Sequence, residues 1–422
     1  MPDPDDPKSS KAGLISRRKL VGAGVAGAAV IHPRTSRAAE TQAGPPSTPA
    51  WTTTQGEPIE SPPYGAPSPF EVGVVRKARR KVAFRTSASS GTPLQKLFGI
   101  VTPNGLHFER HHAGVPAIDP DAHRLMIHGD VTRPMIFTMD DIFRFPSVSR
   151  FHFIECAGNT PFNGGEVGWT AQDTHGLLSC AEWTGVPVAT LLAEVGVKPG
   201  SQWALAEGAD GAAMTRSIPL SKLREDAILA YAQNGERLRP EQGYPLRLVA
   251  PGFEGNMNIK WLRRLKIGDQ PFETREETSR YTELLPSGLA RQFDFVMQVK
   301  SVITAPSGGQ ALRGPGFYEI SGLAWSGRGR VTRVEVSADG GSTWRPATLQ
   351  KPVFSRCLTR FRAPWTWEGG VAELQSRATD ETGEVQPTRA ALIAAVGPNA
   401  TYHFNGIQAW RVAPDGAVTN AV

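Results

Sequence analysis

Hydrophobic and polar positions follow two different patterns along the chain. Between about residues 97 and 268, short apolar runs typical of strands alternate with runs of helical periodicity. The strand-like runs are Leu125–His128, Ser149–Glu155 and Leu246–Ala250, and the helical ones are Met139–Arg144 and Val188–Val195. Strands and helices mixed within one stretch predict an α+β domain, built as a mixed α/β arrangement.

A different pattern follows the polar connector Gln270–Pro286. Short alternating runs broken by Gly and Pro cover residues 297–304, 316–324, 331–338, 360–363 and 371–379. The sequence Asp339-Gly340-Gly341 favours a hairpin turn, because glycine accepts the positive φ angles that such turns need. The spacing predicts an immunoglobulin-like β-sandwich of about 120 residues.

The first 39 residues have the composition of an export signal. Ser16-Arg17-Arg18-Lys19 precedes a run of mostly Gly, Ala and Val that ends at Ile31, and Ala38-Ala39 offers a cleavage site. The paired arginines predict the twin-arginine route, which exports folded proteins, so we expect a periplasmic protein. A run of about 12 apolar residues is too short to span a bilayer; a retained anchor is the alternative.

Residues 40–96 are predicted to form a proline-rich extended arm. The arm contains a basic run made of Arg76, Lys77, Arg79, Arg80 and Lys81. This run is interpreted either as a solvated surface segment or as a docking site for an acidic partner.

Composition narrows the function classes. The 422 residues predict two or three domains, and no apolar stretch is long enough for a membrane span. Loss of residues 1–39 removes seven basic and three acidic residues, which leaves 39 against 37, so nucleic-acid binding is not expected. Among the three cysteines there is no Cys-x-x-Cys pair and no Cys-x-x-Cys-His, so any c-type haem must belong to another chain.

The most informative cysteine lies at the end of a strand-like run, in Glu155-Cys156-Ala157-Gly158-Asn159. The small residues after Cys156 leave space around its sulfur, so this thiol is a structural group, a nucleophile or a metal ligand. Cys180 and Cys357 are predicted to be buried thiols without a role.

A cluster of histidines precedes this block. His107, His111 and His112 could be interpreted as a zinc site, but the glycine and proline residues around them disfavour the helix that would bring them together. Recognition of an anion by Arg110 and His112 fits the pattern better.

A third block follows a strand-like run that contains Tyr231. In it Arg247 starts a strand and Lys260 follows a Pro-Gly loop, a spacing suited to binding a phosphate or a pyranopterin from one side.

Together and in this order, the blocks resemble the sulfite oxidase family of molybdenum enzymes over roughly residues 97–415. The resemblance is carried by Pro103–His112, Cys156–Asn159, Glu182–Val186, Ser217–Leu220, Ala230-Tyr231, Asn234-Gly235, Gly243–Arg247, Lys260-Trp261 and Arg362–Trp365. It implies a molybdopterin-binding domain at 97–285, an Ig-like dimerisation domain at 286–415 that forms a homodimer, and a tail at 416–422. The implied cofactor is Mo-molybdopterin, a pyranopterin dithiolene.

The resemblance also implies roles for residues. Cys156 would be the thiolate on molybdenum, in line with the preference of redox metals for soft ligands. The implied cofactor-binding set is Phe108, Glu109, Arg110, His111, His112, Cys156, Asp210, Gln242, Arg247, Asn258, Ile259 and Lys260. Arg110, Tyr231, Trp183 and Arg362 would face the substrate during oxygen-atom transfer, with water as the oxygen source.

Two positions depart from the family pattern. Thr160-Pro161 stands where the family has Arg-Arg, and Gln242 stands where it has a histidine. With the export signal, the Cys156 block most resembles the molybdenum subunits of sulfane dehydrogenases from the bacterial Sox thiosulfate-oxidising system. That likeness implies a sulfane sulfur held on a carrier-protein cysteine and a c-type cytochrome subunit within a hetero-oligomer. The alternatives are a periplasmic sulfite dehydrogenase that uses cytochrome c and a noncatalytic exported binding protein.

Overall fold

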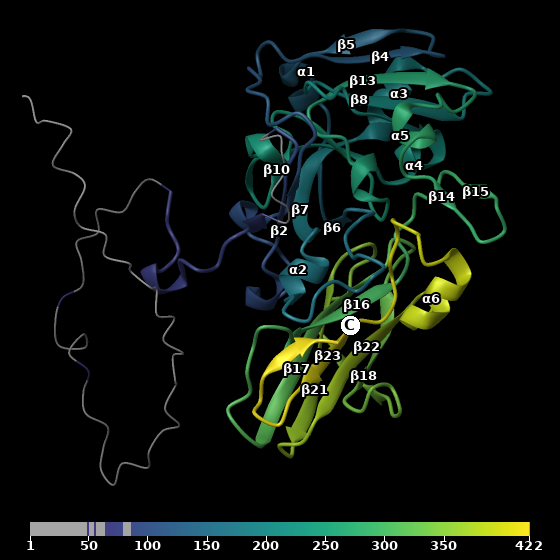
Figure 1. Ribbon diagram of the computed structural model, residues 1–422. Coiled ribbons are helices and arrows are strands. Elements are labelled where there is room, and N and C mark those ends of the chain that lie inside the picture. Colours follow the sequence, from purple (N-terminus) through teal and green to yellow (C-terminus); the bar gives the residue numbers. More distant parts are fainter. Residues whose placement is uncertain (1–48, 50–54, 56–63, 79–85, 422) are drawn as a thin grey trace, which may run out of the picture. The chain divides into compact units, whose positions relative to one another are not determined.

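The computed structural model describes residues 49, 55, 64–78 and 86–421. The predicted signal at 1–39 and residues 79–81 of the basic run lie outside the described residues. From Pro67 onward the described chain forms one unit with two sheet-rich parts, a mixed α/β domain and a sandwich (Figure 1). Within the described residues no helix has the length and apolar character needed to cross a membrane.

Two five-stranded sheets build the first domain. One has the order β11-β10-β7-β6, with β12 paired to β10, and all its pairings are antiparallel. Its strands are β6 (Val148–Glu155), β7 (Leu178–Pro187), β10 (Ile228–Gln233), β11 (Glu236–Arg237) and β12 (Arg247–Val249). The other sheet has the order β5-β4-β13-β8-β9, and in it β13 and β4 are parallel. Its strands are β4 (Leu125–Gly129), β5 (Met135–Phe137), β8 (Trp203–Gly208), β9 (Thr215–Pro219) and β13 (Leu262–Gly268).

Short helices cover these sheets, and the sequence predicted two of them. The bounds of α1 (Met139–Arg144) and α3 (Val188–Val195) coincide with the predicted ranges. Thr138 caps α1 by accepting from the Asp141 backbone N–H, while α3 turns Leu191 and Leu192 into the core. The other helices here are α2 (Ala171–His175), α4 (Leu220–Glu225) and α5 (Arg275–Thr278), with 3₁₀ turns at Asn104–Leu106 (η4), Pro240–Gln242 (η5) and Gly255–Met257 (η6).

The described part of the predicted arm joins the first domain. After the 3₁₀ turn η2 (Pro69–Glu71), β1 (Lys77–Ala78), β2 (Ser89–Gly91) and β3 (Glu109–Arg110) form a small sheet, and η3 (Leu94–Lys96) follows β2. Residues 91–94 are buried, so this part of the predicted arm packs into the folded domain and is not extended. Arg76 forms an ion pair with Glu109, and Lys77 forms one of 2.7 Å with Asp173. These two basic residues therefore bind carboxylates of their own domain.

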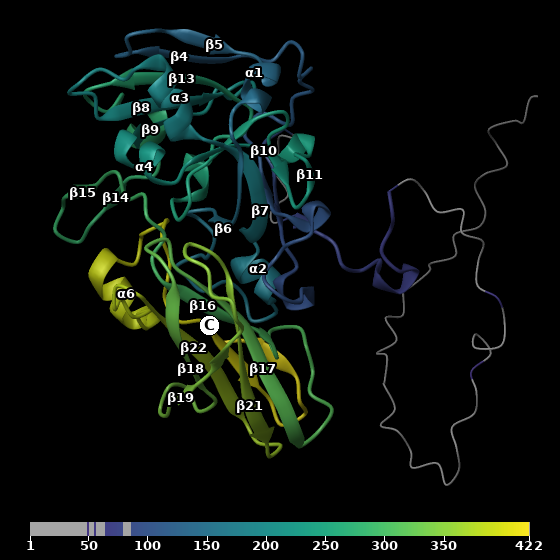
Figure 2. The ribbon, with the colours of Figure 1, turned by 180° about the vertical axis from the view of Figure 1, so that it is seen from behind.

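Two sheets packed face to face form the second domain, which confirms the predicted sandwich (Figure 2). The first sheet contains β16 (Lys300–Ala305), β17 (Gly316–Trp325), β20 (Thr348–Leu349) and β21 (Thr359–Trp367). The second contains β18 (Val331–Ser337), β19 (Arg345–Pro346), β22 (Ala372–Asp380), β23 (Ala409–Val412) and β24 (Val418–Asn420). The hairpin β14 (Glu283–Leu284) and β15 (Ala290–Arg291) precedes the sandwich, and α6 (Arg389–Val396) lies between β22 and β23.

Two details of the sandwich bear on the predictions. The turn after β18 contains Gly340 at φ +71° and Gly341 at φ +89°, and it leads into the antiparallel partner β19, as the sequence predicts. The predicted tail at 416–422 is not a tail, because β24 pairs with β23 and the Val418 side chain is buried.

One hydrophobic core runs across the boundary between the two domains. It joins Phe153 and Leu178 of the first domain to Trp325 and Phe361 of the sandwich. Within it Cys180 of β7 and Cys357 of the sandwich are at most 1% exposed, and their sulfurs lie 3.4 Å apart. Both thiols are therefore buried, as predicted, and they contact each other across the boundary.

Candidate functional site

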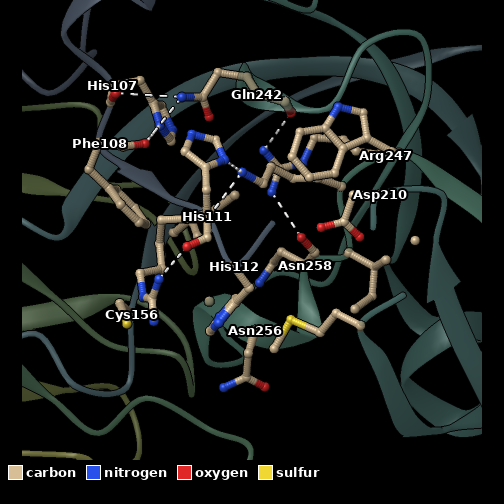
Figure 3. A pocket seen from close by; sticks show the side chains of 18 of the residues that line it. His107, Phe108, His111, His112, Cys156, Asp210, Gln242, Arg247, Asn256 and Asn258 are labelled. Atoms are coloured by element: carbon tan, nitrogen blue, oxygen red, sulfur yellow. Dashed lines mark hydrogen bonds between the residues drawn. The ribbon is translucent and has the colours of Figure 1, made fainter. Parts of the chain in front are cut away.

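A cavity opens in the first domain beside the end of β6 (Figure 3). Its walls come from residues 107–112 around β3, from the turn after β8, from the stretch between η5 and β13, and from the segment after α5. The walls enclose about 770 Å³ including the open mouth, a size typical of sites for cofactors. Cys156 lies toward one end of the cavity, and Gln242 and Arg247 lie toward the other.

The turn that carries Cys156 is fixed by backbone hydrogen bonds. The Cys156 N–H donates to the Leu177 carbonyl at 3.0 Å, and the Asn159 N–H donates to the Cys156 carbonyl at 3.0 Å. Gly255 packs behind this turn. A Cβ atom added to Gly255 would lie 2.9 Å from the backbone carbonyl oxygen of Glu155 and 3.2 Å from the Cys156 Cα. Close packing of two backbones therefore sets the position from which the thiol faces the cavity.

Two cations lie at the far end of the cavity, of which Arg247 is buried and Lys260 is partly buried. Arg247 donates to the backbone carbonyls of Gln242 (2.9 Å) and Asn258 (3.0 Å), and burial lowers its pKa to about 9. Lys260 donates to the carbonyls of Arg110 (3.2 Å) and Glu241 (3.1 Å), and its ammonium lies 2.9 Å from His111 Nδ1. Burial, followed by the charge of Arg247, lowers the pKa of Lys260 to about 7. A negative group bound here would stabilise both cations.

The histidines of the cavity are neutral near pH 7. Burial, reinforced by Arg247, lowers the pKa of His107 to about 3, and burial together with Arg110 lowers that of His112 to about 4. Burial also lowers the pKa of His111, whose Nε2 lies 3.2 Å from Glu109. In this structure His112 is therefore a neutral hydrogen-bonding group.

The zinc interpretation fails on geometry. The segment that carries the histidines contains the 3₁₀ turn η4 and the short strand β3, so no helix face brings the three rings together. In the part of the chain that the structure describes, no group of three or more His, Cys, Asp or Glu side chains is arranged to hold a metal ion.

Comparison with known families supports the two-domain division. Residues 112–276 match the oxidoreductase molybdopterin-binding domain, and residues 291–409 match the Mo-co oxidoreductase dimerisation domain. Sulfite oxidase from Homo sapiens is 32% identical over 371 residues, which cover 79% of this chain and 66% of that protein. Inducible nitrate reductase 2 from Glycine max is 32% identical over 71% of this chain, which spans only 39% of that reductase.

A solved structure aligns over a larger share of the chain. The sulfane dehydrogenase SoxCD from Paracoccus pantotrophus superimposes with a TM-score of 0.87 at 46% identity, covering 90% of this chain and 100% of that one. This chain belongs to the sulfite oxidase family of molybdenum enzymes. The cofactor of this oxidoreductase is accordingly molybdopterin with molybdenum.

The cavity fits the cofactor of a sulfite oxidase family enzyme. Among the described residues, the buried atoms His107 Nε2, Arg247 Nε and Asn256 Nδ2 lack a hydrogen-bond partner, and all three residues line the cavity. Unpaired polar atoms are costly in a protein interior, so these atoms favour a ligand rich in polar groups. A pterin ring and a phosphate have such groups, and Cys156 is a soft thiolate ligand for the metal.

The structure brings most of the predicted cofactor-binding residues to this cavity. Those that line it are Phe108, Arg110, His111, His112, Cys156, Asp210, Gln242, Arg247, Asn258, Ile259 and Lys260. Glu109 does not line it but lies behind His111 and forms the ion pair with Arg76. Gln242 donates to the Phe108 carbonyl at 3.1 Å and so ties β3 to η5 without carrying a charge.

Three residues predicted to face the substrate lie elsewhere. Trp183 is fully buried in β7, and its indole N–H donates to the His152 carbonyl at 3.2 Å. The Tyr231 ring packs edge to face against Phe143, with centroids 5.0 Å apart, and borders the core of the first domain. The guanidinium of Arg362 forms an exposed ion pair of 3.3 Å with Glu319 in the sandwich. Tyr231 and Arg362 do not line the cavity. Trp183 lies directly behind its wall, because the Trp183 ring packs 5.7 Å from the His107 ring and 4.8 Å from the Arg247 guanidinium carbon.

Sequence reasoning missed Tyr281, which lines the cavity. Its backbone is in the left-handed region at φ +48°, its ring packs against Tyr402 at 4.9 Å, and the Arg216 guanidinium lies 5.0 Å from its centroid. Burial, followed by the charge of Cys156, raises the pKa of Tyr281, so its hydroxyl stays protonated and can donate a hydrogen bond. The only sequence signal was an aromatic residue within the polar connector.

Proposed function

We propose that this chain is the molybdenum subunit of a sulfane dehydrogenase. It oxidises a sulfane sulfur held on a cysteine of a carrier protein and passes the electrons to a c-type cytochrome subunit. The match to the sulfane dehydrogenase SoxCD, at 46% identity over 100% of that chain, supports this function.

The environment of Thr160 carries the proposal. Thr160 stands where the family pattern has an arginine, it is 2% exposed, and its hydroxyl accepts from Lys300 at 2.9 Å. This position therefore adds no positive charge to the cavity. A small dianion such as free sulfite depends on cations for its binding, whereas a sulfur delivered on a carrier protein is held by the carrier's own contacts.

When bound, the cofactor supplies oxygen-atom transfer to sulfur, with water as the oxygen source, and accepts two electrons for each transfer. Cys156, at the end of β6, would hold the metal. Arg247 and Lys260 would neutralise the phosphate of the cofactor, and Arg110 would provide a cation for oxygen that develops negative charge on the substrate sulfur. The protonated hydroxyl of Tyr281 donates a hydrogen bond near the thiolate.

The assembly is part of the same proposal. The match of residues 291–409 to a dimerisation domain supports a homodimer through the sandwich, within a hetero-oligomer that includes the cytochrome subunit. The paired arginines Arg17-Arg18 support export of the folded chain to the periplasm by the twin-arginine route.

Metal analysis combined with an electron-acceptor assay tests the function. We expect about one molybdenum per chain, and cytochrome c reduction with carrier-bound sulfane but little with free sulfite. A higher kcat/KM for free sulfite would instead indicate a sulfite dehydrogenase, which the 32% identity to human sulfite oxidase keeps as the second candidate. A properly matured protein without molybdenum would indicate a noncatalytic binding protein.

A further inference from the structure

A buried carboxylate lies directly behind the metal-binding cysteine. Glu155, the residue before Cys156, is 0% exposed and ends β6. Its two oxygens accept from three side chains: Asn159 Nδ2 at 2.9 Å, Lys300 Nζ at 3.0 Å and Trp325 Nε1 at 2.7 Å. The charge of this carboxylate is therefore matched inside the protein.

Two of these three donors come from the sandwich. Lys300 is the first residue of β16, and Trp325 is the last residue of its partner β17. The Lys300 ammonium is 2% exposed and also donates to Thr160 Oγ1 at 2.9 Å. Glu155 precedes the Cys156 turn and Thr160 follows it. The Lys300 ammonium of the second domain therefore forms a hydrogen bond at each end of this turn.

The remaining contacts make this turn rigid. Asn159 donates to Glu155 through Nδ2 and accepts the Leu177 N–H at 2.8 Å through Oδ1. Neither Glu155 nor Lys300 lines the cavity, so the contact of this pair with the metal site is made through the Cys156 turn. A buried ion pair adds little stability over well-packed apolar side chains, so stability alone does not account for this one.

We propose that Lys300 is a positioning residue that fixes the orientation of the Cys156 thiolate toward molybdenum. It acts through Glu155 before the cysteine and Thr160 after it. The second domain thereby sets the geometry of a ligand that belongs to the first. Thr160 also gains a role here, as an anchor for Lys300. The inference rests on the molybdenum cofactor of the proposed function but not on the sulfane substrate.

The main test removes both charges together, with Lys300→Met and Glu155→Gln in one holoenzyme, so that no buried charge is left unpaired. We expect molybdenum content close to that of the unaltered protein and an altered Mo(V) electron paramagnetic resonance spectrum after chemical reduction. We also expect kcat to fall about tenfold to a hundredfold, as small misplacements at reacting centres do, with KM unchanged.

A second measurement needs no bound cofactor. In full-length protein produced without molybdopterin, iodoacetamide should alkylate Cys156 faster in the double variant than in the parent, because the turn is held less tightly. Peptide mass spectrometry would follow the three cysteines separately. Cys180 and Cys357, which are at most 1% exposed, serve as internal controls for unfolding.

A second buried lysine–carboxylate contact provides the control. Lys222 is 4% exposed and lies 2.8 Å from Asp226, which also pairs with Arg356. Lys222 and Asp226 lie at or near α4 and are distant in sequence from the cysteine turn. The variant with Lys222→Met and Asp226→Asn should lose stability while keeping the parent resonance spectrum and the parent rate of Cys156 alkylation.

If the double variant does not fold, Thr160→Val tests the same idea, since it removes one acceptor of Lys300 and leaves the ion pair intact. We expect a smaller spectral change in the same direction. A parent-like spectrum and a parent-like alkylation rate in the folded variant would overturn the proposal. Because the spectrum is recorded with a chemical reductant, a failure of the sulfane assay alone would leave this result standing.

Discussion

The two sides of Cys156 handle charge in different ways. On the cavity side, Arg247 and Lys260 donate mainly to backbone carbonyls, and among the described residues neither has a carboxylate within ion-pair distance. On the sandwich side, Lys300 and Glu155 neutralise each other and every charged atom named has a partner. Cations without a carboxylate partner indicate a binding site for an anionic ligand. A lysine and a carboxylate that neutralise each other indicate a structural role.

The largest expected effect is at the cysteine between the two sides. Cys156→Ser should abolish turnover while pterin remains bound, because the cavity groups that hold the pterin and its phosphate are unchanged. Turnover assays and pterin content after denaturation measure the two properties separately. Retained activity would remove Cys156 from the set of metal ligands.

Breaking the ion pair between Lys300 and Glu155 on the sandwich side should lower the stability of the protein. Lys300→Met alone leaves Glu155 as a buried carboxylate without its counter-ion, so we expect the free energy of unfolding to fall by about 3–5 kcal/mol. Denaturant unfolding of the pterin-free protein measures this loss. An unchanged midpoint would mean that the ion pair is not formed in solution.

Removing a cation on the cavity side should act in the opposite direction. Lys260→Met should weaken pterin retention, yet stabilise the pterin-free protein, because it removes a partly buried charge that has no carboxylate partner. Pterin content and denaturant unfolding are the two readouts. A loss of stability similar to that of Lys300→Met would contradict the contrast between the two sides.

The unpaired charge of Lys260 also predicts a smaller effect, a pH dependence of the stability of the pterin-free protein. The folded protein lowers the pKa of Lys260 to about 7 from an ordinary value of 10.5, so the unfolded chain binds more protons between these values. Stability of the pterin-free protein should therefore rise as pH increases from about 7 toward 10, and the cost of the charge is fully present below pH 7. Unfolding curves across this range should lose this contribution in Lys260→Met.

The smallest effect is expected at Arg362. Its guanidinium is exposed and pairs with Glu319 on the sandwich, so Arg362→Ala should change stability by no more than about 0.5 kcal/mol and leave kcat/KM unchanged. A large loss of kcat/KM would show that this residue reaches substrate in the assembled enzyme.

Local patterns were enough to predict much of the fold. The bounds of α1 and α3 follow directly from apolar periodicity and flanking residues, and the strand that ends beside Cys156 was predicted within one residue as β6. These features depend on residues close together in the sequence. The histidine-rich segment and Arg247, the first residue of β12, could be assigned to one site. Each has a local composition that favours anion binding.

Features that depend on distant contacts were not predictable in this way. Tyr281 reaches the cavity from a polar connector without periodicity, and Lys300 reaches Glu155 across 145 residues of sequence. Trp183 packs behind the cavity wall and Arg362 lies on the sandwich for the same reason, because a motif gives the residue but not the direction of its side chain in the folded chain. The local composition around these four residues contains no signal for their partners.

The hydrophobic core shared by the two domains limits how such enzymes can be recombined. A chimera that took its sandwich from a relative without a lysine at the start of β16 would leave Glu155 buried and unpaired, and would also change what packs on Phe153 and Cys180. The cysteine turn and the sandwich strands that contact it must therefore be exchanged together. A substitution in one of them limits which residues the other can carry.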